Sequence, residues 1–163
     1  MTDRRWIDHG VLLLLARLLL GGTLLTMGFA KVGDPVTFLK LIREYGMVPE
    51  DWPTLLNTMA VTLPWVEVVC GALLVLGIAL RGAAATSLLM LLVFTIAIAW
   101  RAVGMYGDGV EESFCAIHFD CGCGGGDVFV CSKLAENTGL VLLGVVALVS
   151  RSSMLCLRRD LFR

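Results

Sequence analysis

Four apolar stretches, each close to 20 residues long, constrain the fold of this chain more than any other sequence feature. A helix needs about 20 mostly apolar residues to cross the hydrocarbon core of a bilayer. Within lipid every backbone polar group must be paired inside the protein, so such stretches form helices. The predicted spans cover residues 11–30, 59–80, 83–103 and 134–155. They predict an all-α fold, an integral membrane four-helix bundle.

The composition agrees with this class. Hydrophobic residues make up 58% of the 163 residues, above the roughly 45–50% of soluble domains. This length has room for a single four-helix transmembrane domain, residues 1–163, in contact with membrane lipid. The formal net charge of −1 provides no basic field for nucleic acid, so nucleic acid is not an expected partner.

The distribution of basic residues predicts the orientation. Arginines concentrate at the two chain ends and in the short connection between the second and third spans: Arg4, Arg5, Arg81, Arg151, Arg158, Arg159 and Arg163. Positive residues favour the cytoplasmic side. We therefore expect cytoplasmic termini in a bacterial inner membrane, with the loops 31–58 and 104–133 external.

Local signals refine these elements. Arg17 and the length of the first apolar run favour a retained helix over a cleaved signal peptide. Pro64 is expected in the first turn of the second span, where proline is tolerated. Arg81 and Gly82 are expected to form a tight turn between the second and third spans. The pattern VTFLKLIR, residues 36–43, predicts a short amphipathic helix on the outer surface.

The external loop between the third and fourth spans is rich in cysteine and glycine. Its pattern is C-x5-C-x-C-x7-C, formed by Cys115, Cys121, Cys123 and Cys131. In the redox interpretation Cys121 and Cys123 form an exchanging pair, because a ring closed over one residue departs from relaxed disulfide geometry. Cys115 and Cys131 then form a structural bridge or a second exchanging pair. All four are therefore candidate catalytic residues.

Two other interpretations remain open. The four thiolates, with His118, are a candidate set of ligands for zinc or an iron–sulfur centre, although usual zinc pairs are spaced C-x2–4-C. Alternatively, two inert disulfides hold the loop in shape. Four cysteines allow three pairings, and the sequence does not choose among them.

Charged residues inside the predicted spans form a second candidate site. These residues are Arg17, Lys31, Glu67 and Arg101. A charge near the bilayer midplane costs about 2.5–3.5 kcal/mol on insertion scales, so such residues are expected to face the bundle interior and find partners. Glu67 is expected to pair with Lys31 or Arg101, and Arg17 with carbonyl groups, a headgroup or a ligand. The functional interpretation is a polar pocket that binds a quinone head; the alternative is an ion pair that only aligns the helices.

Several motifs together resemble the DoxX superfamily of small four-helix membrane proteins, and in particular its MauE-like, methylamine-utilisation branch. They are Arg17-x3-Gly21, Gly28-x2-Lys31, Tyr45-Gly46-Met47-Val48-Pro49, Leu63-Pro64-Trp65-Val66-Glu67 with Gly71, and Cys121-Gly122-Cys123-Gly124. The resemblance spans residues 11–150. It implies a redox-associated inner-membrane protein with a thioredoxin-like partner, a thiol pair at Cys121 and Cys123, and membrane polar residues at Arg17, Lys31 and Glu67.

The sequence thus favours a membrane-embedded thiol–disulfide redox protein. It would exchange electrons between the cysteines of an external thioredoxin-like or other redox protein and a membrane quinone, or support disulfide maturation of a periplasmic enzyme. Its enzyme class would be a thiol–disulfide or quinone-linked oxidoreductase. The competing class is a non-catalytic assembly or metal-handling subunit.

Overall fold

The computed structural model describes residues 3–109, 113–122 and 126–149, and the side chains from Val11 onward within these ranges. Its elements are α1 (Asp3–Gly33), α2 (Pro35–Glu44), α3 (Pro53–Leu76), α4 (Leu80–Gly107), the 3₁₀ turn η1 (Phe114–Ala116), β1 (His118–Asp120), β2 (Asp127–Phe129) and α5 (Val130–Val149). Four of these helices are long and apolar enough to cross a membrane, over Val11–Gly33, Pro53–Leu76, Leu80–Gly107 and Val130–Val149. The predicted helical membrane bundle is therefore confirmed.

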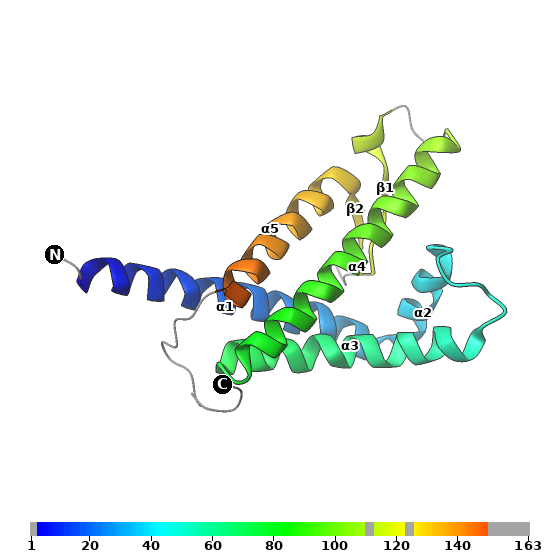
Figure 1. Cartoon of the computed structure of the whole chain (residues 1–163). Coiled ribbons are helices and arrows are strands. Elements are labelled where there is room, and N and C mark those ends of the chain that lie inside the picture. The colour runs from blue at the N-terminus through cyan, green and yellow to red at the C-terminus, as the bar shows by residue number, and fades with distance from the viewer. Residues whose placement is uncertain (1–2, 110–112, 123–125, 150–163) are drawn as a thin grey trace.

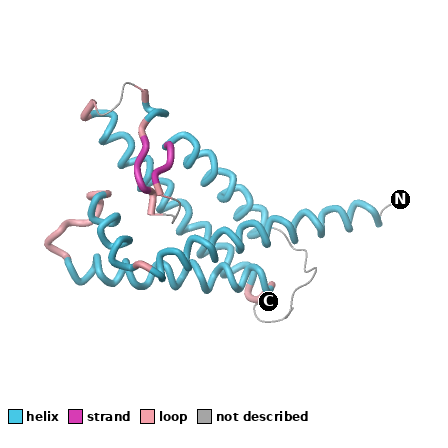
Figure 2. Tube along the Cα trace, turned by 180° about the vertical axis from the view of Figure 1, so that it is seen from behind, coloured by secondary structure: helices cyan, strands magenta, loops and turns pink. Residues whose placement is uncertain are grey.

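The long helices form two antiparallel pairs (Figure 1). Helix α1 packs mainly against α3, and α4 mainly against α5. The two pairs diverge toward the end of the bundle that carries α2 and the β1–β2 hairpin, as the view from behind also shows (Figure 2). Both long connections lie at this end, and the short α3–α4 turn lies at the other.

A buried cluster joins all four long helices where the pairs converge. It consists of Leu20, Leu24, Leu74, Ala83, Ala84, Leu91, Leu140 and Ala147. The opposite faces of the helices carry exposed large apolar side chains such as Leu12, Leu89 and Val149. Such exposed faces suit contact with lipid, because hydrocarbon imposes no cost on them.

Two predicted helix boundaries are wrong. Pro64 lies in the middle of α3 rather than in its first turn, and it is fully buried there. Membrane helices tolerate such a proline because neighbouring groups satisfy the freed carbonyl. The turn between α3 and α4 lies at residues 77–79, not at Arg81 and Gly82, because Gly77 ends α3 in the left-handed conformation with φ 74°.

The predicted amphipathic helix is α2. Asp34 caps its N-terminus by accepting a hydrogen bond from the backbone N–H of Thr37 at 3.0 Å. Phe38 and Leu41 are its buried residues. Tyr45 ends the helix, and Gly46 follows with φ 64°, as the Tyr-Gly-Met-Val-Pro sequence predicts.

The connection between α4 and α5, here called the cysteine segment, contains two short strands in addition to η1. Strands β1 and β2 pair antiparallel, with Phe119 opposite Val128. Ile117 and Val130 are hydrogen-bonded to each other at the open end of this hairpin, and both are buried against Ala102 of α4. The hairpin is therefore attached to the α4–α5 pair by apolar packing.

Candidate functional site

The charged residues of α1 and α3 form a buried ion pair. The Lys31 Nζ atom lies 2.5 Å from Glu67 Oε1. Lys31 is 6% exposed and Glu67 is 1% exposed. Of the two partners expected for Glu67, Lys31 is the one with which it pairs in the structure. In a setting shielded from water, a charge needs such a partner because its desolvation costs several kcal/mol.

Three glycines allow α1 and α3 to approach closely enough for this pairing. A Cβ added at Gly28 would lie 3.1 Å from the Cβ of Glu67, and one added at Gly21 would lie 2.9 Å from the carbonyl oxygen of Gly71. Residues spaced three or four apart share a helix face. Gly28 therefore shares a face of α1 with Lys31, and Gly71 shares a face of α3 with Glu67. The close contact of the two helices at these glycines positions the ion pair.

Two aromatic rings complete the surroundings of the Lys31 ammonium. Its Nζ atom lies 5.2 Å from the ring centre of Phe38 on α2 and 4.7 Å from that of Phe94 on α4. Both distances are within the range of cation–π attraction. The second carboxylate oxygen of Glu67, Oε2, is buried without a hydrogen-bond partner among the described residues.

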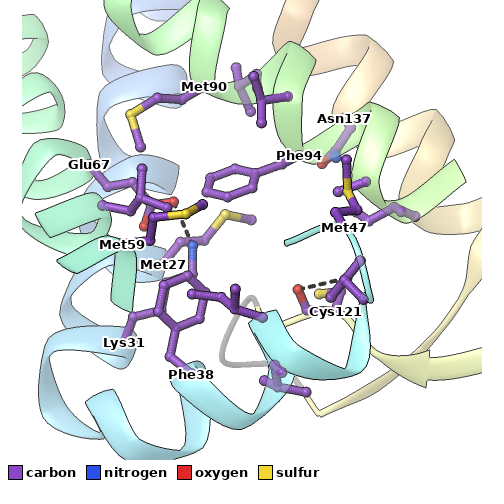
Figure 3. Close-up of a pocket in the computed structure, with 18 of the residues that line it drawn as sticks. Met27, Lys31, Phe38, Met47, Met59, Glu67, Met90, Phe94, Cys121 and Asn137 are labelled. Carbon is purple, nitrogen blue, oxygen red and sulfur yellow. Dashed lines mark hydrogen bonds and ion pairs between the residues drawn. The ribbon is translucent and has the colours of Figure 1, made fainter. Parts of the chain in front are cut away.

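The ion pair lines an apolar cavity of about 410 Å³ between the diverging helix pairs. Ligand pockets of about 300–1,000 Å³ that combine apolar walls with a few polar groups are typical of small-molecule sites. Its walls are rich in methionine and phenylalanine: Met27, Met47, Met59, Met90, Phe38 and Phe94. Figure 3 shows Lys31 and Glu67 on one side of this cavity and Cys121 on the other.

Cys121 lines the cavity, and its segment is held in place by several contacts. The next residue, Gly122, has φ 71° and donates its N–H to Asp120 Oδ1 at 2.9 Å. A Cβ added at Gly122 would lie 3.3 Å from a methyl group of Leu41. Glycine therefore allows both the left-handed backbone and the close packing on α2.

Tyr45 connects the end of α2 to this segment. Its hydroxyl group donates a hydrogen bond to the carbonyl oxygen of Cys121 at 3.3 Å, and its ring packs edge-on against Phe119 of β1. Burial raises the pKa of Tyr45 to about 12. The phenol therefore stays protonated, and able to donate this bond, at neutral pH.

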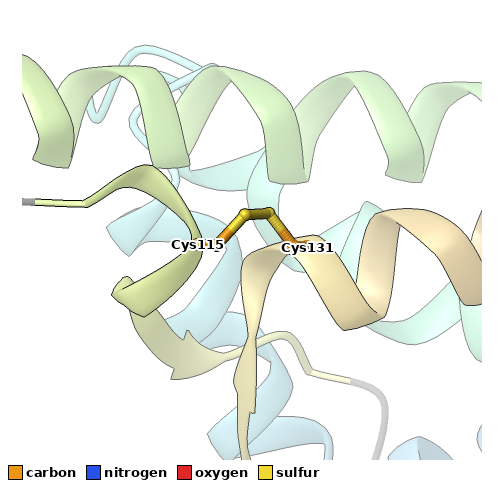
Figure 4. The surroundings of a disulfide bond; sticks show 2 residues. All are labelled: Cys115 and Cys131. Atoms are coloured by element: carbon orange, nitrogen blue, oxygen red, sulfur yellow. A yellow bond between two sulfur atoms is a disulfide. The ribbon is translucent and has the colours of Figure 1, made fainter.

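The other described cysteines of the motif form a disulfide. Cys115 of η1 is bonded to Cys131 in the first turn of α5 (Figure 4). Cys115 is exposed and Cys131 is partly buried, so this bond lies at the surface of the protein. Cys121 is also disulfide-bonded. Its predicted partner, Cys123, lies outside the described residues.

The disulfides bear on the predicted metal site. Among the described residues no group of three His, Cys, Asp or Glu side chains is placed to hold a metal ion. In this form Cys115, Cys121 and Cys131 carry no thiolates, so zinc or iron–sulfur binding by them would first require reduction. His118 is exposed, and its Nδ1 atom lies 3.3 Å from the carbonyl oxygen of Ala116.

The two arginines expected near the cavity do not line it. Arg17 is 5% exposed, and it donates from Nε to the carbonyl oxygen of Leu74 at 3.1 Å and from Nη2 to that of Val75 at 3.4 Å. These carbonyls belong to the last turn of α3, whose C=O groups have no partner within the helix. Arg101 is partly buried on α4 and forms no ion pair with any described residue.

Sequence reasoning missed several residues of the site. Phe94 and the cavity methionines lie in apolar runs without a distinguishing pattern. Asn137 also lines the cavity, and its Nδ2 group donates to Thr95 Oγ1 of α4 at 3.3 Å. An amide within an apolar span is a detectable signal, because a polar group in a membrane helix needs a partner.

The fold and site define a small helical membrane protein that holds a cysteine segment against an intramembrane cavity. A family model described as "Methylamine utilisation protein MauE" matches residues 9–150. The chain belongs to this family. Neither the curated proteins nor the solved structures gave a match. The comparisons do not extend to the wider DoxX superfamily, so that assignment stays a prediction.

Proposed function

We propose that this protein is a membrane-embedded thiol–disulfide redox protein that exchanges electrons between an external partner and a quinone in the cavity. The observation that carries the proposal is that the disulfide-bonded Cys121 lines the same cavity as the Lys31–Glu67 ion pair. A redox-active sulfur and a buried cation then face one apolar space.

The cavity suits a quinone ring. Its walls are apolar and aromatic, and its volume of about 410 Å³ lies within the range of small-molecule pockets. The Lys31–Glu67 pair supplies polar groups for the oxygen atoms of such a ring, and Phe94 and Phe38 offer flat surfaces beside them. A quinone bound there would supply a two-electron, two-proton acceptor for a pair of thiols.

In the proposed exchange, two electrons pass from the partner through the two disulfides in turn. A partner thiolate attacks one sulfur of the exposed Cys115–Cys131 bond, and a mixed disulfide forms. The partner's second thiolate resolves this bond, so the partner gains a disulfide and Cys115 and Cys131 become thiols. These thiols then reduce the Cys121–Cys123 disulfide in the same way. A quinone held in the cavity would then accept the two electrons and two protons that reoxidation of Cys121 and Cys123 yields.

The same exchange operates in reverse when the potentials of partner and quinone favour it. The partner class is a thioredoxin-like or other redox protein on the external side of the inner membrane. The family description links the protein to methylamine utilisation. Support of disulfide maturation in an enzyme of that process is therefore the physiological context that we propose.

Trapping of a mixed disulfide tests the exchange. The variants Cys115→Ser and Cys131→Ser each leave one thiol of the exposed pair, and one of them should accumulate a covalent complex with an oxidised, disulfide-containing thioredoxin-like protein on a non-reducing gel. The remaining thiolate attacks the partner's disulfide, and no second thiol of this pair is present to resolve the mixed disulfide. A Cys156→Ser variant provides the control, because this cysteine is predicted to be cytoplasmic. It should behave like the parent.

A redox titration tests the cavity pair. Cys121 and Cys123 should titrate reversibly in a glutathione buffer at a potential above the roughly −300 mV below which structural disulfides lie. The variant Cys121→Ser should lose quinone reduction but keep its helical content. Full activity in the Cys121→Ser/Cys123→Ser double variant would reject the mechanism and favour the non-catalytic assembly subunit. Metal bound by the reduced thiols would favour the metal-handling subunit.

A further inference from the structure

On the polar side of the cavity, one buried hydrogen-bond acceptor has no donor among the described residues. Glu67 is 1% exposed, and its Oε1 atom is bonded to Lys31. Its Oε2 atom is buried and has no donor among the described residues. A buried acceptor without a donor destabilises the protein, and more so when it is charged.

The surroundings of Glu67 do not supply the missing donor. The Lys31 ammonium is engaged by Oε1 and by the faces of Phe38 and Phe94. The amide group of Asn137 donates to Thr95, and the hydroxyl group of Tyr45 donates to the carbonyl oxygen of Cys121. The remaining described wall is almost entirely apolar. A molecule in the cavity that carries a hydroxyl group would therefore satisfy Oε2.

We propose that Glu67 is the specificity-determining residue of the cavity, where its Oε2 atom accepts a hydrogen bond from a ring hydroxyl group and so selects the reduced, hydroquinone form of the ligand. Lys31 is a positioning residue, because it holds Oε1 in an ion pair and leaves Oε2 without a donor among the described residues. The inference rests on the proposed function for the ligand class and adds which redox form is bound and by which atom.

Selective binding of the reduced form has a direct redox consequence. A bound form that is stabilised tenfold over its oxidised partner shifts the potential of a two-electron couple upward by about 30 mV. The cavity would thus make the bound quinone a stronger oxidant of the Cys121 thiol pair. This direction of shift favours disulfide formation in the protein and its partner.

The test measures binding and does not depend on turnover. The full chain with Cys121→Ser and Cys123→Ser, in detergent, is titrated with a decyl-substituted hydroquinone, its quinone and its dimethyl ether, and Kd is measured by calorimetry. The dimethyl ether has the same ring but no hydroxyl donors. We expect the hydroquinone to bind about tenfold more tightly than the ether and the quinone, as one hydrogen bond to a charged group predicts.

The Glu67→Gln variant tests the residue. Its single amide oxygen is expected to bond Lys31, so its NH₂ group faces the cavity and the preference for hydroquinone should be lost. Glu50→Gln, at an exposed residue before α3, should keep the parent's preference. The comparison of the three ligands on the chain that keeps Glu67 does not depend on whether the Glu67→Gln or the Glu50→Gln variant folds.

The outcomes separate this inference from the proposed function. Equal binding of hydroquinone and dimethyl ether, or binding of neither, would overturn the role of Glu67. Thiol exchange with a partner can still occur in both cases, so the trapping experiment would remain valid. A hydroquinone preference without any thiol exchange would support this inference and reject the proposed electron transfer.

Discussion

At the scale of single residues, the Lys31–Glu67 pair combines a structural and a functional demand. Both side chains are removed from water, so each depends on the other for compensation of its charge. Apolar residues of similar size would hold α1 and α3 together without that requirement. The position of the ion pair beside a cavity is the reason that we propose a binding role in addition to a structural one.

The first prediction concerns the loss of one charge of this pair. Glu67→Leu should lower the free energy of unfolding by about 3–5 kcal/mol, because Lys31 is then buried without compensation. The Lys31→Met/Glu67→Leu double variant should recover most of this loss, since no charge remains. Denaturation in detergent micelles measures both. Equal stability of Glu67→Leu and the parent would show that Lys31 reaches water.

The second prediction concerns Tyr45. Its pKa is raised to about 12 from an ordinary value of about 10, and burial is the main cause. Because the folded state favours the neutral phenol, this contribution to stability is full below about pH 10 and is lost as the pH rises toward about 12. The hydrogen bond to the Cys121 carbonyl group should be lost over the same range.

Tyrosinate absorbance provides the measurement, since the chain contains only two tyrosines. The difference between the titrations of the parent and Tyr45→Phe isolates Tyr45, and its midpoint should fall near pH 12. A midpoint near pH 10 would mean that the ring is open to solvent and does not hold the cysteine segment on α2.

At the scale of elements, glycines determine how closely α1 and α3 pack, because they have no side chain at the points of contact. Gly21 and Gly71 each place a backbone carbonyl oxygen where a Cβ of the other would lie, at 2.9 and 2.8 Å. Small residues at such contacts let membrane helices gain packing and backbone interactions that larger residues prevent. The ion pair lies on the same faces of these helices, so it depends on this approach.

The third prediction compares neighbouring glycines. Gly21→Ala should destabilise the bundle by about 1–3 kcal/mol, because the new methyl group meets the backbone of α3. Gly22→Ala is the matched control, since an added Cβ there meets nothing within 4 Å. It should stabilise the helix by up to about 1 kcal/mol. Similar melting of the two variants would argue against the close helix contact.

At the scale of the whole molecule, the alternating direction of the four long helices places α2 and the cysteine segment at the same end. The cavity lies there because the two helix pairs diverge toward that end and α2 lies between them. The cysteine segment, the cavity and the short amphipathic helix α2 therefore lie at the same end of the bundle. The proposed function places both its external partner and its membrane-soluble ligand at this end.

The fourth prediction concerns the orientation of this end. Arginine placement predicts that it faces outward. After reduction of intact cells with an impermeant reductant, an impermeant maleimide should label Cys115 and its neighbours in the external segment, but not Cys156. Permeabilised cells are the control, in which Cys156 should also react. Labelling of Cys156 alone in intact cells would invert the topology.

The helices were predictable because the membrane constraint acts locally. A run of about 20 apolar residues must pair its own backbone groups, whatever its neighbours are. Helix α2 was predictable for a similar reason, because the amphipathic pattern of residues 36–43 is also a local signal. The two ends of α3 were predicted wrongly. Pro64 lies within the helix rather than in its first turn, and the turn after the helix begins at Gly77 rather than at Arg81 and Gly82.

The amino-acid pattern predicts the class of fold, the four spanning helices, the charged residues and the cysteines that carry the proposed chemistry. The pairing of Glu67 with Lys31, the binding of Arg17 to the end of α3 and the bond between Cys115 and Cys131 become visible only in the folded chain. The tertiary structure alone brought Cys121 to the cavity beside the ion pair. The physical reason is that helix formation depends on neighbours along the chain, whereas pairing and cavity shape depend on how closely helices approach in space.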